Sequence, residues 1–143
     1  MRGLKIILPL FLTLFCVVCS AAETDSGYSQ FWSTFRQAVL DNDKGKIVEM
    51  TRFPFEVRGP DDSDPVQPYD HHGFLSIYEK LVAQAVFLPS DGKIISKTMR
   101  QLIDEKKAIT PADHPTSDSF QVHQFEFRRI KGKWFFTRAY LEE

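Results

Sequence analysis

The hydrophobic and polar positions divide the chain into a short apolar leader and a longer segment of mixed pattern. An apolar run over residues 6–18 follows two basic residues and leads to Ser-Ala-Ala at residues 20–22. A basic start, a short apolar stretch and small residues before a polar segment are typical of a secretory signal peptide. The run is too short to cross about 30 Å of hydrocarbon as a helix. We therefore expect a signal peptide at residues 1–22 and a single folded domain at residues 23–143.

Helical spacing opens the expected domain. Between Tyr28 and Asn42 the apolar residues fall three or four positions apart, at Phe31, Phe35, Ala38 and Val39. This spacing predicts an amphipathic helix. Asp43 is placed to cap a second, short helix, and Pro54 disfavours helix in the residue before it. The two segments together predict a helical hairpin.

A strand and an exposed loop are predicted next. Phe53, Phe55 and Val57 alternate with other residues and predict a short strand, which Gly59-Pro60 closes. Residues 61–69 hold three aspartates and two prolines and predict an exposed loop with a brief extended piece near Val66.

The middle of the chain has mostly helical periodicity. Asp70 can cap a third helix, which we expect over residues 73–87. After a turn at residues 89–92, apolar spacing favours a fourth helix that ends near Lys107. The alternative for residues 93–107 is a strand that includes Ile94 and Ile95.

The C-terminal segment has the clearest strand pattern. Residues 119–130 and 133–141 flank Lys131-Gly132, and glycine suits the positive φ of a tight hairpin turn. A two-residue turn would pair Arg129 with Trp134, Phe127 with Phe136, Phe125 with Arg138, and His123 with Tyr140. Phe120 and Val122 have the other parity, so we expect a β-bulge near His123-Gln124.

The ring-rich face of this hairpin is expected to point inward. Arg138 would then lie among aromatic rings, where it would either extend past them to solvent or point into a cavity. In the second case it would anchor a partly apolar or anionic ligand in an aromatic pocket. The predicted ligand-binding residues are His123, Phe125, Phe136, Arg138 and Tyr140.

The order of these elements resembles the cone-shaped NTF2-like superfamily. The resemblance is carried by Phe31-Trp32-Ser33-Thr34-Phe35, by Arg52-Phe53-Pro54-Phe55 and by Lys133-Trp134-Phe135-Phe136. It implies an α+β fold in which helices pack on a curved antiparallel sheet that encloses a pocket. Members of the superfamily include isomerases, dehydratases and non-enzymatic binding modules, so the activity stays open. The enzymes resemble one another in placing an acid, a base or a tyrosine in the cone, and His123 and Tyr140 are the counterparts here.

The positions of the cysteines and the net charge restrict the choice of cellular compartment and of binding partner. Both cysteines precede residue 22, and the large residues before them, Phe15 and Val18, disfavour lipidation. The expected domain therefore has no disulfide, and its only asparagine, Asn42, lies outside a glycosylation sequon. These features favour the bacterial periplasm. The domain carries 16 basic and 19 acidic residues, which argues against nucleic acid as a partner.

Two charged segments are candidates for separate sites. The loop with Asp61, Asp62 and Asp64 lacks the glycine and the glutamate of a calcium loop, so we expect no metal there but consider it a surface for a partner protein. The basic residues of segment 128–134 are expected to form a solvated hairpin tip.

The sequence thus favours a binding or accessory domain without a cofactor. Its partner would be a small, partly apolar or anionic ligand or a periplasmic protein, and a homodimer is compatible with the pattern. One alternative is a small acid–base enzyme that uses His123 and Tyr140. Another is an inhibitor or immunity-type protein that binds its target through Asp61, Asp62 and Asp64.

Overall fold

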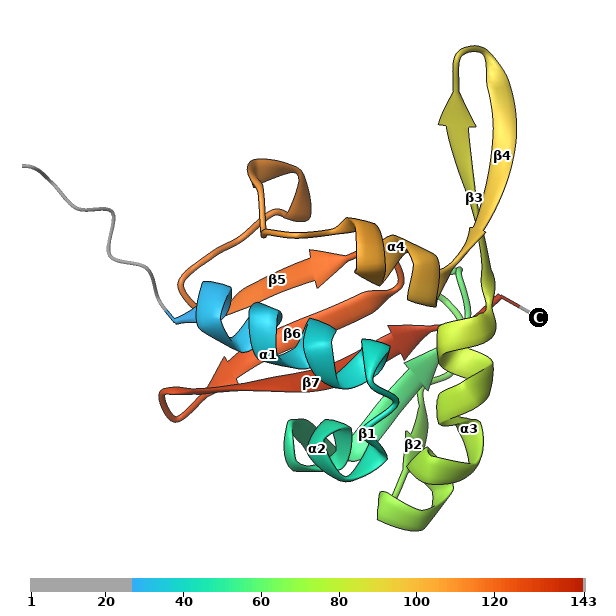
Figure 1. The fold of residues 1–143 in the computed structure, drawn as a ribbon. Coiled ribbons are helices and arrows are strands. Elements are labelled where there is room, and N and C mark those ends of the chain that lie inside the picture. The colour runs from blue at the N-terminus through green and yellow to red at the C-terminus, as the bar shows by residue number, and fades with distance from the viewer. Residues whose placement is uncertain (1–26, 143) are drawn as a thin grey trace, which may run out of the picture.

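The computed structural model describes residues 27–142, and the expected signal peptide lies outside these residues. The described chain combines helices and strands (Figure 1), which confirms the predicted α+β class. The helices are α1 (Tyr28–Leu40), α2 (Lys44–Glu49), α3 (His71–Ala83), α4 (Met99–Glu105) and the short 3-10 helix η1 (Pro111–Asp113). The strands are β1 (Thr51–Arg58), β2 (Gln67–Tyr69), β3 (Ala85–Ser90), β4 (Lys93–Thr98), β5 (Ser119–Val122), β6 (Phe125–Ile130) and β7 (Lys133–Tyr140).

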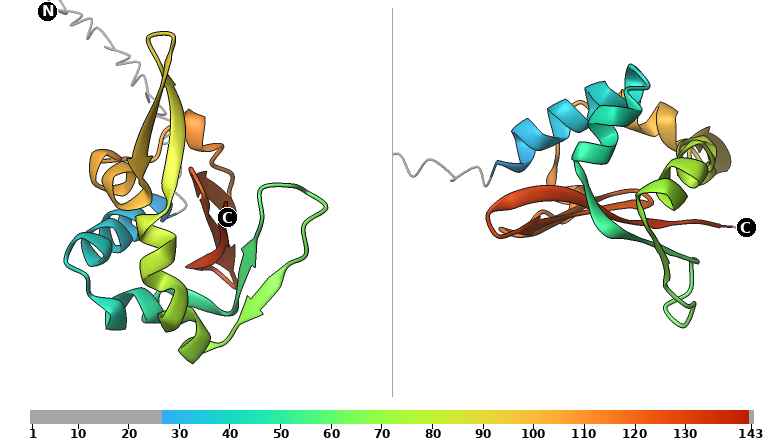
Figure 2. Two further views of the ribbon diagram at one scale, coloured as in Figure 1. Left: turned by 90° about the vertical axis from the view of Figure 1, so that its right-hand side faces the viewer. Right: turned by 90° about the horizontal axis from the view of Figure 1, so that it is seen from below.

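Five strands form the main sheet, in the order β2-β1-β7-β6-β5. The neighbours β1 and β7 are parallel, and the other pairs are antiparallel. The helices lie over one face of this sheet (Figure 2). Within residues 27–142 no helix covers the opposite face, which we call the open face. None of the described helices is long and apolar enough to cross a membrane.

The local predictions for the helix starts are confirmed. Asp43 and Asp70 cap α2 and α3, because their carboxylates accept backbone N–H bonds from Lys46 at 2.9 Å and from Gly73 at 2.8 Å. On the face of α1 that the spacing predicted, Phe35, Ala38 and Val39 are buried and Phe31 is partly buried. Such caps depend only on residues three positions apart, so the sequence alone reveals them.

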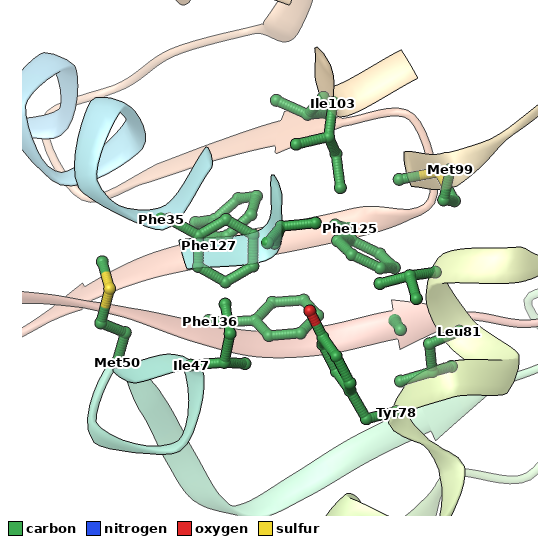
Figure 3. Close-up of a cluster of buried hydrophobic side chains, with 14 of the residues drawn as sticks. Phe35, Ile47, Met50, Tyr78, Leu81, Met99, Ile103, Phe125, Phe127 and Phe136 are labelled. Atoms are coloured by element: carbon green, nitrogen blue, oxygen red, sulfur yellow. The ribbon is translucent and has the colours of Figure 1, made fainter. Parts of the chain in front are cut away.

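Aromatic rings fill the space between the helices and the main sheet. Phe127 and Phe136 pair across β6 and β7 and lie 4.9 and 5.1 Å from Phe35 of α1, measured between ring centroids. Phe125 lies 4.7 Å from Phe136 (Figure 3). All four side chains are fully buried. Aromatic pairs at these distances add about 0.5–1.5 kcal/mol each beyond the burial of their area, so these rings hold the core together.

The prediction for the middle of the chain is wrong in part. The third helix ends at Ala83, and the residues expected to complete it start β3, which pairs with β4 in a separate hairpin. Thus Ile94 and Ile95 belong to a strand, and only the second half of the expected fourth helix, α4, is helical. The turn consists of Asp91 and Gly92, both with positive φ. An Asp-Gly pair between two apolar runs is a strong hairpin signal, and it outweighs the helical spacing of residues 95–103.

The C-terminal strands also depart from the prediction at one point. The expected long strand over residues 119–130 is two strands, because His123 and Gln124 form the turn between β5 and β6. His123 has a φ of 49°, a conformation that histidine adopts more readily than most residues. The turn through Lys131 and Gly132 is confirmed, with φ values of 50° and 80°.

Candidate functional site

A β-bulge places Arg138 on the open face of the main sheet. The predicted register holds from the turn to the pair Phe127–Phe136, but beyond it Arg138 lies opposite Glu126 and Ala139 lies opposite Phe125. The extra residue is Thr137 in β7, not a residue near His123. Because neighbouring side chains along a strand point to opposite faces, a shift by one residue reverses every later position. The predicted pairs Phe125–Arg138 and His123–Tyr140 are therefore wrong.

Charged side chains from three neighbouring strands meet around Arg138. Its partners in register are Glu56 of β1 and Glu126 of β6. The guanidinium donates two hydrogen bonds to one carboxylate oxygen of Glu56, the Nε bond at 2.8 Å, and lies 3.8 Å from Glu126. Burial by itself lowers the pKa of Arg138, but its bonds to Glu56 and Tyr140 and the charge of Glu126 raise it overall. Arg138 therefore acts as a fixed cation between two carboxylates.

Glu126 is the buried member of this cluster. Only 9% of the residue is exposed, although it lies on the open face. Its carboxylate accepts hydrogen bonds from Arg128 and from the hydroxyl of Tyr140, the latter at 3.2 Å. A carboxylate at this depth is tolerated because several donors surround it.

The five predicted ligand-binding residues lie on both sides of the main sheet. Phe125 and Phe136 are core residues on the helix-covered side, whereas Arg138 and Tyr140 belong to the cluster on the open face. His123 is exposed in the β5–β6 turn. Although part of the side chain reaches solvent, desolvation of the rest lowers the pKa of His123, the nearby Lys106 lowers it further, and Asp113 opposes this shift. The contacts above do not bring the five side chains together as one aromatic pocket.

Two small hollows on the open face lie beside the Arg138 cluster and share Arg52 and Ile130. One has a volume of about 200 Å³ and includes Glu126, Arg128 and Arg138 in its wall. The other, of about 250 Å³, is lined by Arg52, Ile130, Lys131, Lys133 and Phe135. The second hollow therefore combines three cations with an apolar floor and contains no acidic residue in its lining.

The cations of the second hollow are largely unneutralised. Within residues 27–142, neither Arg52 nor Lys131 forms an ion pair with a carboxylate. The ammonium group of Lys133 lies 5.1 Å from the ring centre of Phe135, a cation–π contact. The basic segment 128–134 was visible in the sequence, but Arg52 comes from a distant strand and nothing local indicated that it joins this segment.

The acidic loop has a defined internal structure. The carboxylate of Asp64 accepts a bond from the backbone N–H of Asp61 at 2.9 Å. Arg58 donates to the backbone carbonyls of Asp62 and Asp64. Asp61 and Asp62 are exposed, whereas Asp64 is half-buried. Only the first two therefore present their carboxylates fully to a partner.

Comparisons with known proteins supply no relative. No family model matches this chain, and no curated protein or solved structure matches it significantly. Among residues 27–142, no group of three or more His, Cys, Asp or Glu side chains is arranged to hold a metal ion.

Proposed function

We propose that the protein is an exported binding module, periplasmic and NTF2-like in architecture, that holds an anionic and partly apolar ligand on its open face. The observation that carries this proposal is the second hollow, where Arg52, Lys131 and Lys133 surround an apolar floor. Helices packed on a mostly antiparallel sheet support the architecture. The separate β3–β4 hairpin is a departure from a complete cone.

Packing favours the open face over the interior as the binding region. The interior between helices and sheet is occupied by rings in direct contact, such as Phe125 with Phe136 and Phe35 with Phe127. A ligand there would have to displace these contacts. On the open face the hollows already exist, and the cations that line them are within reach of solvent and of an incoming anion.

The chemistry of the hollows indicates the class of ligand. The second hollow, of about 250 Å³, lies near the lower end of the range of about 300–1,000 Å³ typical of small-molecule sites. Ile130 and Phe135 suit a short hydrocarbon, and Arg52 with Lys131 suits a carboxylate or sulfate through charge-assisted hydrogen bonds. A small amphiphilic anion satisfies both requirements.

Titration with decanoate, below the concentration at which it forms micelles, tests the proposal. We expect Arg52→Ala to weaken binding about ten-fold, because one charge-assisted hydrogen bond is lost. Added salt should weaken binding too, since the site is exposed and its charges are screened.

Two controls isolate the role of the site. Lys107→Ala removes a cation that is 71% exposed and lies after α4, and it should leave the affinity unchanged. Decanol has the same number of carbon atoms without the charge and should bind more weakly than decanoate. Equal affinity of the Arg52→Ala variant and the parent, or of decanoate and decanol, would refute the proposal.

A further inference from the structure

Four cations from separate segments of the chain meet at one end of the main sheet. Lys131 and Lys133 lie in and after the β6–β7 turn at this end. The linings of two hollows connect them to Arg52 of β1 on the open face and to Lys46 of α2 on the helix-covered side. We call these four residues the basic end. Because they come from distant segments, only the fold brings them together.

The opposite end of the main sheet is acidic. Strands β1 and β7 run parallel, with Arg58 in register with Tyr140. The acidic loop that follows β1 therefore lies at the far end from the β6–β7 turn (Figure 2), where Asp61 and Asp64 line a hollow. Residues 27–142 carry as many basic as acidic side chains. The described part of the chain is thus neutral in sum but has a positive and a negative pole.

The charge of the basic end is not cancelled by neighbouring carboxylates. Glu49 is the one acidic residue in the linings of the two hollows. It lies 3.1 Å from Lys46, but the two side chains are 45% and 70% exposed. Exposed pairs of this kind are weak and exchange readily with other partners. The basic end therefore attracts an extended anionic surface.

The chain that precedes the described residues joins the molecule at the same end. Gly27 lines one of the two hollows together with Gly132, Lys133 and Trp134. The sequence before Gly27 includes the apolar run 6–18 of the expected signal peptide, a segment that enters a membrane during export. The cations thus lie on the side of the molecule that faces the membrane in the precursor. This position favours a membrane over a nucleic acid or an acidic protein.

We propose that the basic end docks on the surface of an anionic phospholipid bilayer, with the acidic loop directed away from it. Each lysine or arginine near such a surface strengthens binding about five-fold. Four of them give reversible docking that added salt weakens. The inference goes beyond the proposed function, because it depends on the charge of this end and includes Lys46, which lies outside the second hollow.

Co-sedimentation with lipid vesicles tests the proposal. One set contains equal parts of phosphatidylglycerol and phosphatidylcholine, and the other contains phosphatidylcholine alone. The protein is produced from the full chain and its N-terminus is determined by mass spectrometry, because an uncleaved apolar leader would bind neutral vesicles too. We expect the parent to prefer the anionic vesicles, and Lys46→Gln and Lys133→Gln each to weaken this binding about five-fold.

Each substitution has a matched control. Lys93→Gln matches Lys133→Gln, because each lysine follows the glycine of a hairpin turn, but Lys93 lies on the separate β3–β4 hairpin. Lys107→Gln matches Lys46→Gln, because each lysine pairs with an acidic residue three positions away. Both controls should bind anionic vesicles like the parent.

Fluorescent labels test the orientation on the membrane. Residues 23–143 contain no cysteine, so a single introduced cysteine defines one labelling site. Gln30→Cys places the label in the lining of the hollow at the basic end, and Val66→Cys places it in the acidic loop, where Val66 is 41% exposed. A quencher attached to the lipid should quench the label at residue 30 more strongly than the label at residue 66.

Three results would overturn the proposal. They are equal binding of the parent to anionic and neutral vesicles, binding that Lys46→Gln and Lys133→Gln weaken no more than their controls do, and equal quenching of the two labels. Capture of a nucleic acid or an acidic protein without binding to anionic vesicles would overturn it too.

Decanoate titration separates this inference from the proposed function. Lys46→Gln should leave decanoate binding unchanged, because Lys46 does not line the second hollow. Decanoate binding without vesicle binding would refute the docking alone. Vesicle binding without decanoate binding would refute the proposed function alone.

Discussion

Replacement of Tyr78 by phenylalanine should stabilise the protein. Tyr78 lies on α3 with its hydroxyl directed into the core (Figure 3), and it is 1% exposed. Within residues 27–142 the hydroxyl has no hydrogen-bond partner. A buried hydroxyl without a partner costs about 1–3 kcal/mol relative to water. Part of this gain is lost with the packing contacts of the oxygen, so we expect a net stabilisation of about 1 kcal/mol at pH 7, and a rise in Tm of about 4 °C.

We also expect the effect of Tyr78 on stability to depend on pH. Burial raises the pKa of Tyr78 to about 12; Arg100 lowers it and Glu79 raises it further. In the unfolded chain the hydroxyl loses its proton near pH 10, before it does so in the folded protein. The folded state therefore loses stability through this group as the pH rises from about 10 to 12, by roughly 3 kcal/mol in total. The advantage of Tyr78→Phe should grow over this interval.

Urea unfolding followed by tryptophan fluorescence at pH 7 and pH 11 measures both effects. Tyr69→Phe is the control, because it removes the hydroxyl of a tyrosine that is only half-buried. A Tyr78→Phe variant that is less stable than the parent at pH 7 would show that the hydroxyl is satisfied in solution. That result would refute the conclusion that the unpartnered hydroxyl of Tyr78 lowers the stability of the folded protein.

Three further substitutions and one control substitution test individual contacts, each by urea unfolding at pH 7. Arg138→Ala should destabilise by about 1–2 kcal/mol, because it removes the ion pair with Glu56 and one of the two cations beside the buried Glu126, which keeps its bond from Arg128; a loss below about 0.5 kcal/mol would contradict this role. Thr98→Ala should cost about 1 kcal/mol, since Thr98 forms the capping box of α4, and an unchanged midpoint would argue against the cap. Asp64→Ala should cost about 1 kcal/mol and the exposed Asp62→Ala less than about 0.5 kcal/mol; equal effects would show that the loop lacks the bond at Asp61.

Features that depend on neighbouring residues could be predicted from the sequence. The caps at Asp43 and Asp70 and the turn at Lys131-Gly132 depend on a few adjacent positions. Helix α1 could also be predicted without knowledge of distant contacts, because apolar residues at helical spacing indicate a helix whatever part of the core they pack against.

Features that depend on distant strands could not be predicted. The bulge at Thr137 separates the pair Phe127–Phe136 from the pair Glu126–Arg138. Beside it, the parallel pairing of β1 with β7 also changes register, between Thr51 and Glu56. Strand β1 lies about 80 residues before β7 in the chain. No local pattern in the sequence of β7 therefore indicates the register in which the two strands pair. A one-residue shift was enough to move Arg138 from the predicted interior to the open face.

The aromatic content of the sequence left two interpretations open for a related reason. A high number of rings is compatible with a ligand pocket and with a core between short helices and a twisted sheet, and composition alone does not separate the two. The structure uses the rings for the core: Phe55 lies 4.7 Å from Phe136, and Phe120 lies 4.7 Å from Phe127. Because aromatic side chains fill the interior, the surfaces available for recognition are those that the helices leave uncovered. Among residues 27–142 the open face is such a surface, and Arg52, Lys131 and Lys133 line a hollow on it.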